Sequence, residues 1–248
     1  AYRFPSSESQ ISPGDTLFLV LRRLGYYGIK FGDEQGLSGV DTILFDGHPI
    51  NAGIVLAAKA EGHTIVTIEG LGQHPDQGWK KTEGLHPLQQ AFIESGAIQC
   101  GYCTPAQILA AKALLDKNPM PTESEVREAI SGVLCRCTGY HKPVLAIMRA
   151  AAVLRGEKGI PIEEIDLQSV SGTFQSVGKS AIKVDASKLA QGKPVFTADF
   201  DQQNMLYAKV LRSPYAHALI EKIDTRKAKQ LSGVVAVLTW QDRPRVVY

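Results

Sequence analysis

All four cysteines of this 248-residue chain lie in two short motifs. One motif is C-G-Y-C, with Cys100 and Cys103, and the other is C-R-C, with Cys135 and Cys137. Thiols that are grouped in this way, with none elsewhere, indicate one site with four thiolate ligands. Because thiolates are soft ligands, such a site takes a zinc ion or an iron–sulfur cluster. A dithiol redox switch at the first motif is a third interpretation, although no βαβ pattern surrounds it.

The elements that must position these thiols are helices. Thr104-Pro105 opens a helix directly after Cys103, and the amide groups and dipole at a helix start stabilise thiolates. Cys135 and Cys137 follow another helix, in a loop that has glycine on both sides. We expect both motifs to lie at the ends of helices in one bundle. The four expected helices begin near Pro87, Thr104, Thr122 and Pro143.

Cysteine spacing separates the two metal occupants only in part. A C-x-C pair is tight for a zinc site, in which two residues usually separate the cysteines. The same spacing suits a cluster with two irons that each take two thiolates. The backbone amides of Gly101, Tyr102, Arg136 and Thr138 could then donate hydrogen bonds to the sulfurs and tune the redox potential. A structural zinc ion that holds the helices together remains the alternative.

The flanking regions are predicted to contain strands, so the expected fold class is α+β. On the amino-terminal side we expect a helix at 17–24, a hairpin at 42–50 around Asp46-Gly47 and a strand at 64–68. A linker without periodicity follows the helices at 157–176. Beyond it we expect strands at 205–211, 218–224 and 234–238, with a short helix at 225–230.

Composition excludes several classes of partner. The chain has 27 basic and 25 acidic residues and a net charge of +2, which gives no basis for binding nucleic acid or an anionic membrane. No apolar run is long enough to span a bilayer, and the start lacks the pattern of a secretory signal. We therefore expect a cytoplasmic protein. In a reducing cytoplasm, clustered cysteines bind metal or do redox chemistry more often than they form disulfides.

The sequence around both motifs resembles the helical iron–sulfur domain of the xanthine dehydrogenase and aldehyde oxidoreductase family of molybdenum hydroxylases. The resemblance rests on Q-C-G-Y-C-T-P at 99–105, C-R-C-T-G-Y at 135–140, H-P-L-Q-Q-A-F-I-E-S-G-A-I-Q from residue 86 onwards, and P-T-E-S-E-V-R-E-A-I-S-G before the second motif. It implies that Gln99 and the backbone near Cys137 approach a molybdopterin. It also implies which residues bind the 2Fe–2S cluster nearest that pterin, namely Cys100, Cys103, Cys135 and Cys137.

The first region resembles the β-grasp, plant-type ferredoxin domain of the same family. That domain normally holds a second cluster with a C-x4-C-x2-C loop and a fourth, later cysteine. Here Asp33, Ser38, Asp41 and Gly53 stand at the four ligand positions. Oxygen ligands suit a sulfide-bridged cluster poorly, and glycine offers no ligand. We therefore predict that no second cluster forms, that the loop is looser or held by hydrogen bonds, and that the two aspartates cap turns rather than bind a hard cation.

The last region resembles the start of the family's α/β-hammerhead, the first part of its molybdenum-binding portion. The match begins at Val177-Gly178-Lys179 and includes L-R-S-P-Y-A-H-A at 211–218, and the linker leaves no room for a flavin domain. We interpret His217 as a turn or packing residue. The predicted domains are a β-grasp domain at 1–78, a helical 2Fe–2S domain at 79–156, the linker, and a partial hammerhead at 177–248.

The resemblance implies a function in electron transfer. We expect part of a xanthine or hypoxanthine dehydrogenase-like enzyme, which relays electrons from molybdopterin through a single 2Fe–2S cluster. The molybdopterin would be held mainly by residues outside this chain, which would contain no catalytic residue. The partners would be the remaining molybdenum-binding portion, in the same polypeptide or a companion chain, and an electron acceptor or flavin subunit, in an oligomer. The alternative is a structural or docking module that holds zinc or no metal at Cys100, Cys103, Cys135 and Cys137.

Overall fold

The computed structural model describes residues 2–3, 11–71, 84–158, 181–193, 196–200 and 204–242. The chain forms two compact units, Ala1–Asp201 and Gln202–Tyr248. The predicted linker at 157–176, except for its first two residues, lies outside the described residues. The same holds for Val177-Gly178-Lys179, at which the hammerhead resemblance begins.

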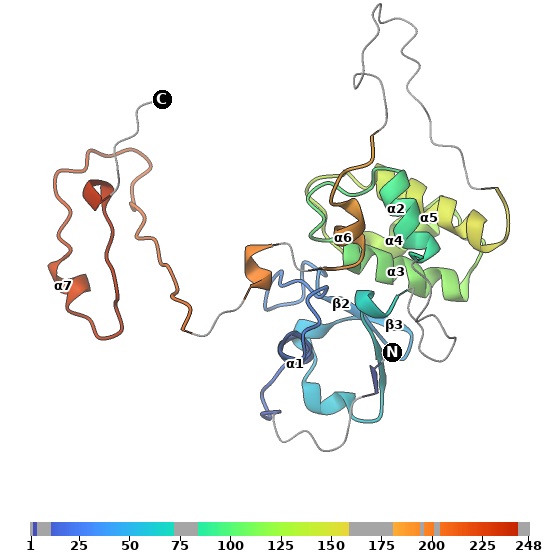
Figure 1. Cartoon of the computed structure of the whole chain (residues 1–248), viewed down its shortest axis with the longest axis horizontal. Helices are drawn as coiled ribbons and strands as arrows, with labels where there is room; N and C mark the ends of the chain where they lie inside the picture. The colour runs from blue at the N-terminus through green and yellow to red at the C-terminus, as the bar shows by residue number, and fades with distance from the viewer. Residues whose placement is uncertain are drawn as a thin grey trace, which may run out of the picture. The chain divides into compact units, whose positions relative to one another are not determined.

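An antiparallel sheet forms the amino-terminal part of the first unit (Figure 1). Its spatial strand order is β1-β4-β2-β3. Asp46 and Gly47 turn the β2–β3 hairpin with φ angles of 48° and 79°, and a type I′ turn requires positive φ at both positions. The predicted hairpin is therefore confirmed. The strands are β1 (Tyr2–Arg3), β2 (Thr42–Phe45), β3 (His48–Asn51) and β4 (Thr64–Val66).

Helix α1 (Leu17–Arg23) packs on this sheet and confirms the helix predicted there. Its buried side chains recur at the three- and four-residue spacing that places them on one helix face. They form a core together with residues of β2 and β4, made by Leu17, Val20, Leu21, Ile43 and Ile65. Three short 3-10 turns complete this part, η1 (Ala52–Ile54), η2 (Ala57–Ala60) and η3 (Ile68–Gly70). The strand predicted at 64–68 ends at Val66, before η3 begins.

Four helices follow, as the sequence predicts (Figure 1). Pro87 stands at the first position of its helix. Proline is tolerated there because a backbone N–H at this position would make no hydrogen bond within the helix. Thr122 and Glu125 form the expected capping box. The last helix begins two residues before Pro143, which the first turn tolerates for the same reason. The helices are α2 (Pro87–Glu94), α3 (Thr104–Lys117), α4 (Glu123–Ser131) and α5 (His141–Leu154).

Strand β2 contributes to two hydrophobic cores. Successive side chains of a strand point to opposite faces. Accordingly Ile43 belongs to the core under α1, whereas Leu44 belongs to the core of the four helices. Helix α3 contacts β2 and is buried on most of its sides. The sheet and the helices are therefore packed against each other rather than joined only by the chain.

A short helix late in the first unit joins the same core. Helix α6 (Ala186–Ala190) contacts α2 and α3, and its Leu189 is 3% exposed. The 3-10 turn η6 (Thr197–Asp199) follows it. The domain boundary predicted at residue 177 remains a prediction. The structure shows that residues 186–190 share the hydrophobic core of the helices.

The second unit differs from its prediction. Helix α7 (Arg226–Lys229) confirms the short helix expected at 225–230, and η7 (Trp240–Asp242) is a 3-10 turn. Among residues 204–242, however, the structure has no strand, so the strands predicted at 205–211, 218–224 and 234–238 are wrong. Alternating apolar residues form a strand only where another strand supplies hydrogen-bond partners. Here such residues face solvent, and Leu211 is 98% exposed. Across the described ranges, no helix combines the length and apolar character that crossing a bilayer needs.

Candidate functional site

Folding brings the two cysteine motifs together. The side chain of Cys100 interacts with that of Cys137, and the side chain of Cys103 interacts with that of Cys135. Each of these contacts joins the loop before α3 to the loop after α4. Cys100 and Cys137 are exposed, whereas Cys103 is 7% exposed and Cys135 is half-buried. The site therefore has a closed side and a side that is open to solvent.

The start of α3 sets the geometry of the first motif. Cys103 is the residue that precedes the first helical turn, and its carbonyl accepts from Gln107 N–H at 3.0 Å. Gly101 has φ of 83°, a backbone conformation that residues with a side chain adopt at a cost. The Tyr102 N–H donates a hydrogen bond to the Cys100 sulfur. A glycine and the helix start therefore place both sulfurs.

Burial and mutual repulsion disfavour thiolates at part of this site. Burial raises the pKa of Cys103, and Cys135 adds to that shift. Burial also raises the pKa of Cys100, beside Cys137. At Cys135 burial acts in the same direction, but hydrogen bonds from the Thr138 side chain and backbone outweigh it and lower the pKa. Four thiolates together thus need added positive charge, which a bound metal would supply.

The second motif is held by residues that follow it. Thr138 Oγ1 lies 3.1 Å from Cys135 Sγ. The Tyr140 hydroxyl accepts from Cys135 N–H and donates to the Val133 carbonyl. The structure thus confirms Tyr102 and Thr138 as amide donors to the sulfurs. The sequence does not predict that Tyr140 holds the Cys135 backbone, because the C-R-C-T-G-Y motif does not indicate which groups the tyrosine hydroxyl contacts.

The four thiols lie in two pairs, Cys100 with Cys137 and Cys103 with Cys135. In the part of the chain that the structure describes, no three His, Cys, Asp or Glu side chains converge as ligands of one ion do. A two-iron cluster divides its thiolates between two metals, whereas zinc takes all four around one point. The donor set and its pairing therefore fit a 2Fe–2S cluster. Gln99 is exposed next to Cys100, and its expected approach to a pterin remains a prediction.

Asp33 accepts hydrogen bonds from three backbone amides of the loop in which a second cluster would be expected. Its Oδ1 accepts from Gln35 N–H at 2.8 Å and from Leu37 N–H at 3.0 Å, and its Oδ2 accepts from Ser38 N–H at 2.7 Å. The nearby Ser38 hydroxyl and these amides hold the pKa of Asp33 well below its usual value. The predicted turn cap is confirmed at this residue.

Asp41 and Gly53 are joined in the same way. Asp41 Oδ2 accepts from Gly53 N–H at 2.6 Å, and burial raises the pKa of this carboxyl group. A Cβ atom at Gly53 would lie 2.9 Å from Asp41 Oδ2. The positions at which the family's second cluster would be ligated therefore lie near one another and are joined by hydrogen bonds. The predicted hydrogen-bonded loop is confirmed.

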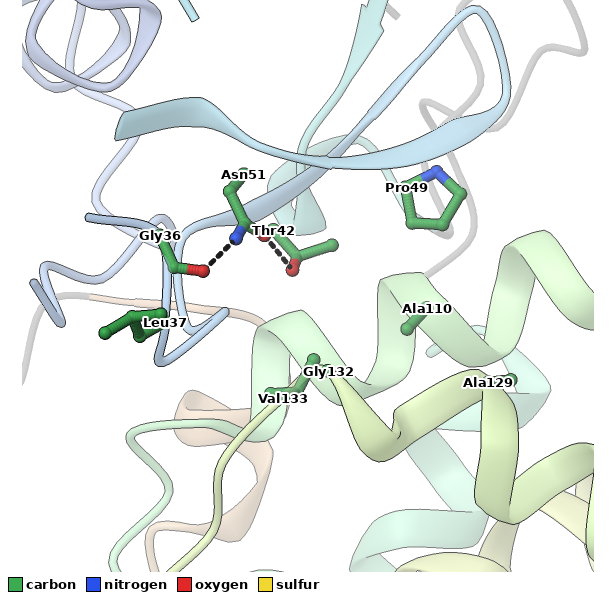
Figure 2. Close-up of a pocket in the computed structure, with 9 residues that line it drawn as sticks. All are labelled: Gly36, Leu37, Thr42, Pro49, Asn51, Ala110, Ala129, Gly132 and Val133. Atoms are coloured by element: carbon green, nitrogen blue, oxygen red, sulfur yellow. Dashed lines mark hydrogen bonds between the residues drawn. The ribbon is translucent and has the colours of Figure 1, made fainter. Parts of the chain in front are cut away.

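A pocket of about 350 Å³ lies beside this loop (Figure 2). Asn51 Nδ2 donates to the Gly36 carbonyl at 2.6 Å across one wall. The lining contains no acidic, basic or thiol group, so it offers no acid–base or metal chemistry. Its residues are Gly36, Leu37, Thr42, Pro49, Asn51, Ala110, Ala129, Gly132 and Val133.

Comparison with known proteins agrees with this geometry. Residues 67–155 match the family described as the 2Fe-2S binding domain. Residues 191–248 match the a/b hammerhead domain of aldehyde oxidase and xanthine dehydrogenase. The nicotinate dehydrogenase small FeS subunit of Eubacterium barkeri is 45% identical over 56% of this chain and 83% of its own length. The chain belongs to the xanthine dehydrogenase and aldehyde oxidoreductase family of molybdenum hydroxylases.

Two longer members of this family match nearly the whole chain. The probable hypoxanthine oxidase XdhD of Escherichia coli K12 is 34% identical over 97% of this chain. The crystal structure of the aldehyde oxidoreductase from Desulfovibrio desulfuricans matches 92% of it, with a TM-score of 0.69 and 38% identity. The chain spans 24% and 25% of these two relatives. The predicted family resemblance is thus confirmed, including the 2Fe–2S domain and the hammerhead portion.

Proposed function

We propose that this chain is the electron-transfer part of a molybdenum-containing hydroxylase, with one 2Fe–2S cluster. The observation that supports this most strongly is the convergence of two sequence-distant cysteine pairs on one site with a closed and an open side. The proposed cluster ligands are Cys100, Cys103, Cys135 and Cys137.

The residues of this chain would hold the cluster and set its surroundings. When bound, a 2Fe–2S cluster accepts and releases single electrons. Cys103 and Cys135 anchor the side that is shielded from water, which lowers the local dielectric constant. Tyr102 N–H and Thr138 Oγ1 lie against the sulfurs and stabilise negative charge there. The open side at Cys100 is the place for a redox partner to approach.

A single cluster is part of the proposal. The Asp33 and Asp41 carboxylates accept hydrogen bonds from backbone amides, and Gly53 offers no side-chain ligand. Electrons from a molybdopterin centre would therefore reach this chain at one redox site only, near Gln99 and Cys137. From there they would pass directly to an acceptor or flavin subunit rather than through a second cluster.

The whole protein's activity is proposed from its relatives. Their names include a hypoxanthine oxidase, an aldehyde oxidoreductase and a nicotinate dehydrogenase subunit. We therefore propose hydroxylation of an N-heterocycle or aldehyde, with oxygen from water, and a purine as the first substrate to test. The molybdenum-binding portion would follow in the same polypeptide or as a companion chain, in a cytoplasmic oligomer.

Metal analysis of the full-length protein tests the cluster. We expect iron and sulfide in equal amounts, about two of each per chain, and one paramagnetic iron–sulfur species on reduction. Cys137→Ser should lose most of the iron, whereas Asp33→Asn, in the hydrogen-bonded loop, should retain it. Two distinct paramagnetic iron–sulfur centres would contradict the single cluster. A colourless protein with stoichiometric zinc, prepared without oxygen, would support the docking-module alternative.

A cysteine-restored variant tests whether the loop keeps the geometry for a second cluster. Because the four positions lie close together, Asp33→Cys, Ser38→Cys, Asp41→Cys and Gly53→Cys in combination should raise the iron content about twofold. The triple variant that leaves Gly53 unchanged is the matched control, since it lacks the fourth ligand. Unchanged iron in the quadruple variant would show that the loop no longer accepts a cluster.

A further inference from the structure

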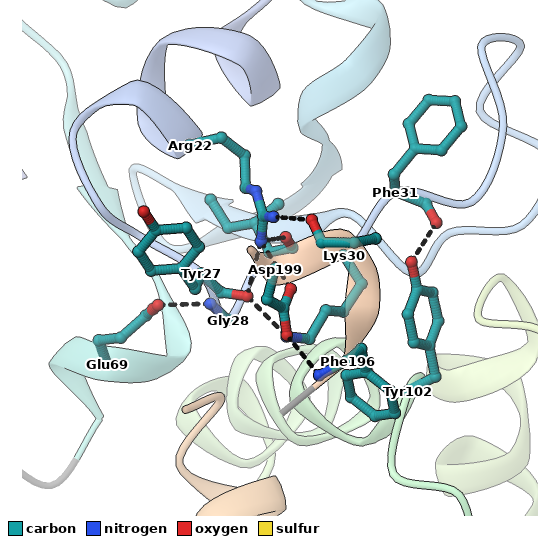
Figure 3. Close-up of polar contacts among 11 residues, drawn as sticks. Arg22, Tyr27, Gly28, Lys30, Phe31, Glu69, Tyr102, Phe196 and Asp199 are labelled. Atoms are coloured by element: carbon teal, nitrogen blue, oxygen red, sulfur yellow. Dashed lines mark hydrogen bonds and ion pairs between the residues drawn. The ribbon is translucent and has the colours of Figure 1, made fainter. Parts of the chain in front are cut away.

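A buried charge cluster joins the amino-terminal part of the first unit to its last residues (Figure 3). Asp199 Oδ2 lies 2.7 Å from Lys30 Nζ, and Asp199 Oδ1 lies 2.9 Å from Arg22 Nη1. The side chains of Lys30 and Asp199 are each 1% exposed. Arg22 Nη2 also donates to the Ala198 carbonyl at 2.6 Å. A carboxylate and an ammonium group are thus buried together, beside a partly buried guanidinium group.

The stability of this buried charge cluster depends on all three of its charged side chains. Burial lowers the pKa of Lys30, and Asp199 opposes that shift. At Asp199 burial acts to raise the pKa, but the hydrogen bonds from Lys30 and Arg22 outweigh it. Loss of one partner would leave an uncompensated buried charge, which is strongly destabilising. Asp199 therefore fixes where residues 196–200 lie.

Phe196 carries that constraint to the cysteine motif. Asp199 Oδ2 accepts from Phe196 N–H at 3.2 Å, and Lys30 Nζ lies 5.0 Å from the centre of the Phe196 ring. The Phe196 ring meets the Tyr102 ring edge-on, with 5.0 Å between centres and an interplanar angle of 78°. Tyr102 also donates from its hydroxyl to the Phe31 carbonyl at 2.7 Å. Its ring is therefore held from two sides.

Tyr102 lies between the two cysteines of the first motif. Its N–H donates to the Cys100 sulfur. The Cα–Cβ and Cβ–Cγ bonds of Tyr102 link the orientation of its ring to that of this amide. Leu189 packs against Gly101 from the same late segment, so closely that a Cβ atom there would lie 2.6 Å from a Leu189 methyl group. Leu189 and Phe196 thus contact the two residues between Cys100 and Cys103, Gly101 and Tyr102.

We propose that Asp199 is a positioning residue for the iron–sulfur site, which acts through Phe196 on Tyr102 and thereby on the loop that carries Cys100 and Cys103. Asp199 and Phe196 belong to the stretch that matches the hammerhead domain, whereas the loop belongs to the 2Fe-2S binding domain. The rigidity of the loop that carries Cys100 and Cys103 therefore depends on a segment that matches the hammerhead domain. This inference rests on the proposed function for the presence of the cluster.

Hydrogen exchange in the full-length, iron-loaded protein tests this role. Asp199→Asn keeps the shape of the side chain and removes its charge. We expect the amides of residues 100–104 to exchange about tenfold faster than in the unmodified protein, and the paramagnetic spectrum of the reduced protein to change. Asp15→Asn is the matched control, because it breaks another aspartate–arginine pair in the same part of the chain, Asp15–Arg23. It should leave exchange at 100–104 within about twofold.

Each outcome decides between a positioning role and a merely structural one. If Asp199→Asn loosens residues 196–200 but leaves residues 100–104 and the spectrum unchanged, the proposal is wrong. If that variant does not fold, Phe196→Leu decides, because it keeps the ion pairs of Asp199 and removes the ring that contacts Tyr102 and Lys30. It should also accelerate exchange at 100–104, and no change there would overturn the proposal. Iron content of the unmodified protein is measured separately, so a missing cluster is distinguishable from a missing role of Asp199.

Discussion

The Tyr140 hydroxyl accepts a hydrogen bond from the Cys135 backbone N–H at 2.8 Å. The same hydroxyl donates to the Val133 carbonyl at 3.2 Å, so one side chain holds the peptide on both sides of Leu134. Tyr140→Phe keeps the ring and leaves both backbone groups without this partner. We expect a loss of about 1–3 kcal/mol in the free energy of unfolding, measured by urea denaturation.

The same variant should release iron faster to a chelator, because Cys135 then lies in a less ordered loop. Tyr215→Phe is the control, since its side chain is 72% exposed and lies in the second unit. Equal rates of iron release from the two variants would show that the Tyr140 hydroxyl does not hold the site.

Gly101→Ala should be more damaging than Gly96→Ala. Both glycines have positive φ, of 83° and 64°, so both substitutions carry a backbone cost of about 1 kcal/mol. Only at Gly101 would the new methyl group collide with Leu189, and nothing lies within 4 Å of a Cβ at Gly96. We expect Gly101→Ala to cost about 1–3 kcal/mol more than Gly96→Ala in unfolding free energy.

A double-mutant cycle isolates that collision. In a Leu189→Ala background, Gly101→Ala should cost about as much as Gly96→Ala, because the obstructing methyl groups are gone. If the difference between the two glycine substitutions persists in that background, the collision with Leu189 is not its cause.

Asp33 should make stability depend on acid pH. Hydrogen bonds hold its pKa below the ordinary value of 3.8 in the folded chain. Its stabilisation is therefore fully present above about pH 4 and is lost as the pH falls toward its folded pKa. Asp33→Asn should lower the urea midpoint at neutral pH, and this difference should shrink as the pH falls below about 4. Glu34→Gln removes one charge from the same loop and should show no such convergence.

His86 should also make stability fall with falling pH, but at milder pH. Burial, with Lys112 nearby, lowers its pKa from 6.5 to about 4, and Asp116 opposes the shift. Its Nδ1 accepts from Leu88 N–H at 3.2 Å at the start of α2, which requires the neutral ring. Between about pH 6.5 and 4 the unfolded chain binds the proton first, so unfolding should become easier by about 3 kcal/mol in total.

His86→Ser separates the cap from the titration. Serine also accepts a hydrogen bond at a helix start and does not titrate in this range. The variant should therefore show a flatter dependence of unfolding free energy on pH over this interval, with His217→Gln as the control. An unchanged slope in His86→Ser would assign the pH dependence to other groups.

Local features of the chain could be predicted from its sequence. The capping box at Thr122, the first-turn proline at Pro87 and the Asp46-Gly47 turn each involve residues within one turn of each other. The cysteine motifs also carry their own chemistry in their spacing. For the same reason the start of α3, and with it the position of Cys103, follows from a few neighbouring residues.

Contacts between distant residues could not be predicted. Lys30 and Asp199 are separated by 169 positions, and neither stands in a pattern that points to the other. The strands expected in the second unit failed for a related reason, because alternation at Leu211 or Val235 says nothing about which strand lies beside them. The hydroxyl contacts of Tyr140 likewise depend on how its loop folds back.

The division of β2 between two cores explains what the amino-terminal part contributes to the helices. Ile43 faces the core under α1 while Leu44, next to it, fills the core of the helices, together with Val40, Ile68 and Leu71. Removing residues 1–71 would therefore strip one wall from the helices and leave their apolar side chains in water. The amino-terminal part and the four helices should unfold in a single thermal transition. A shortened chain that begins at α2 should not fold into an electron carrier on its own.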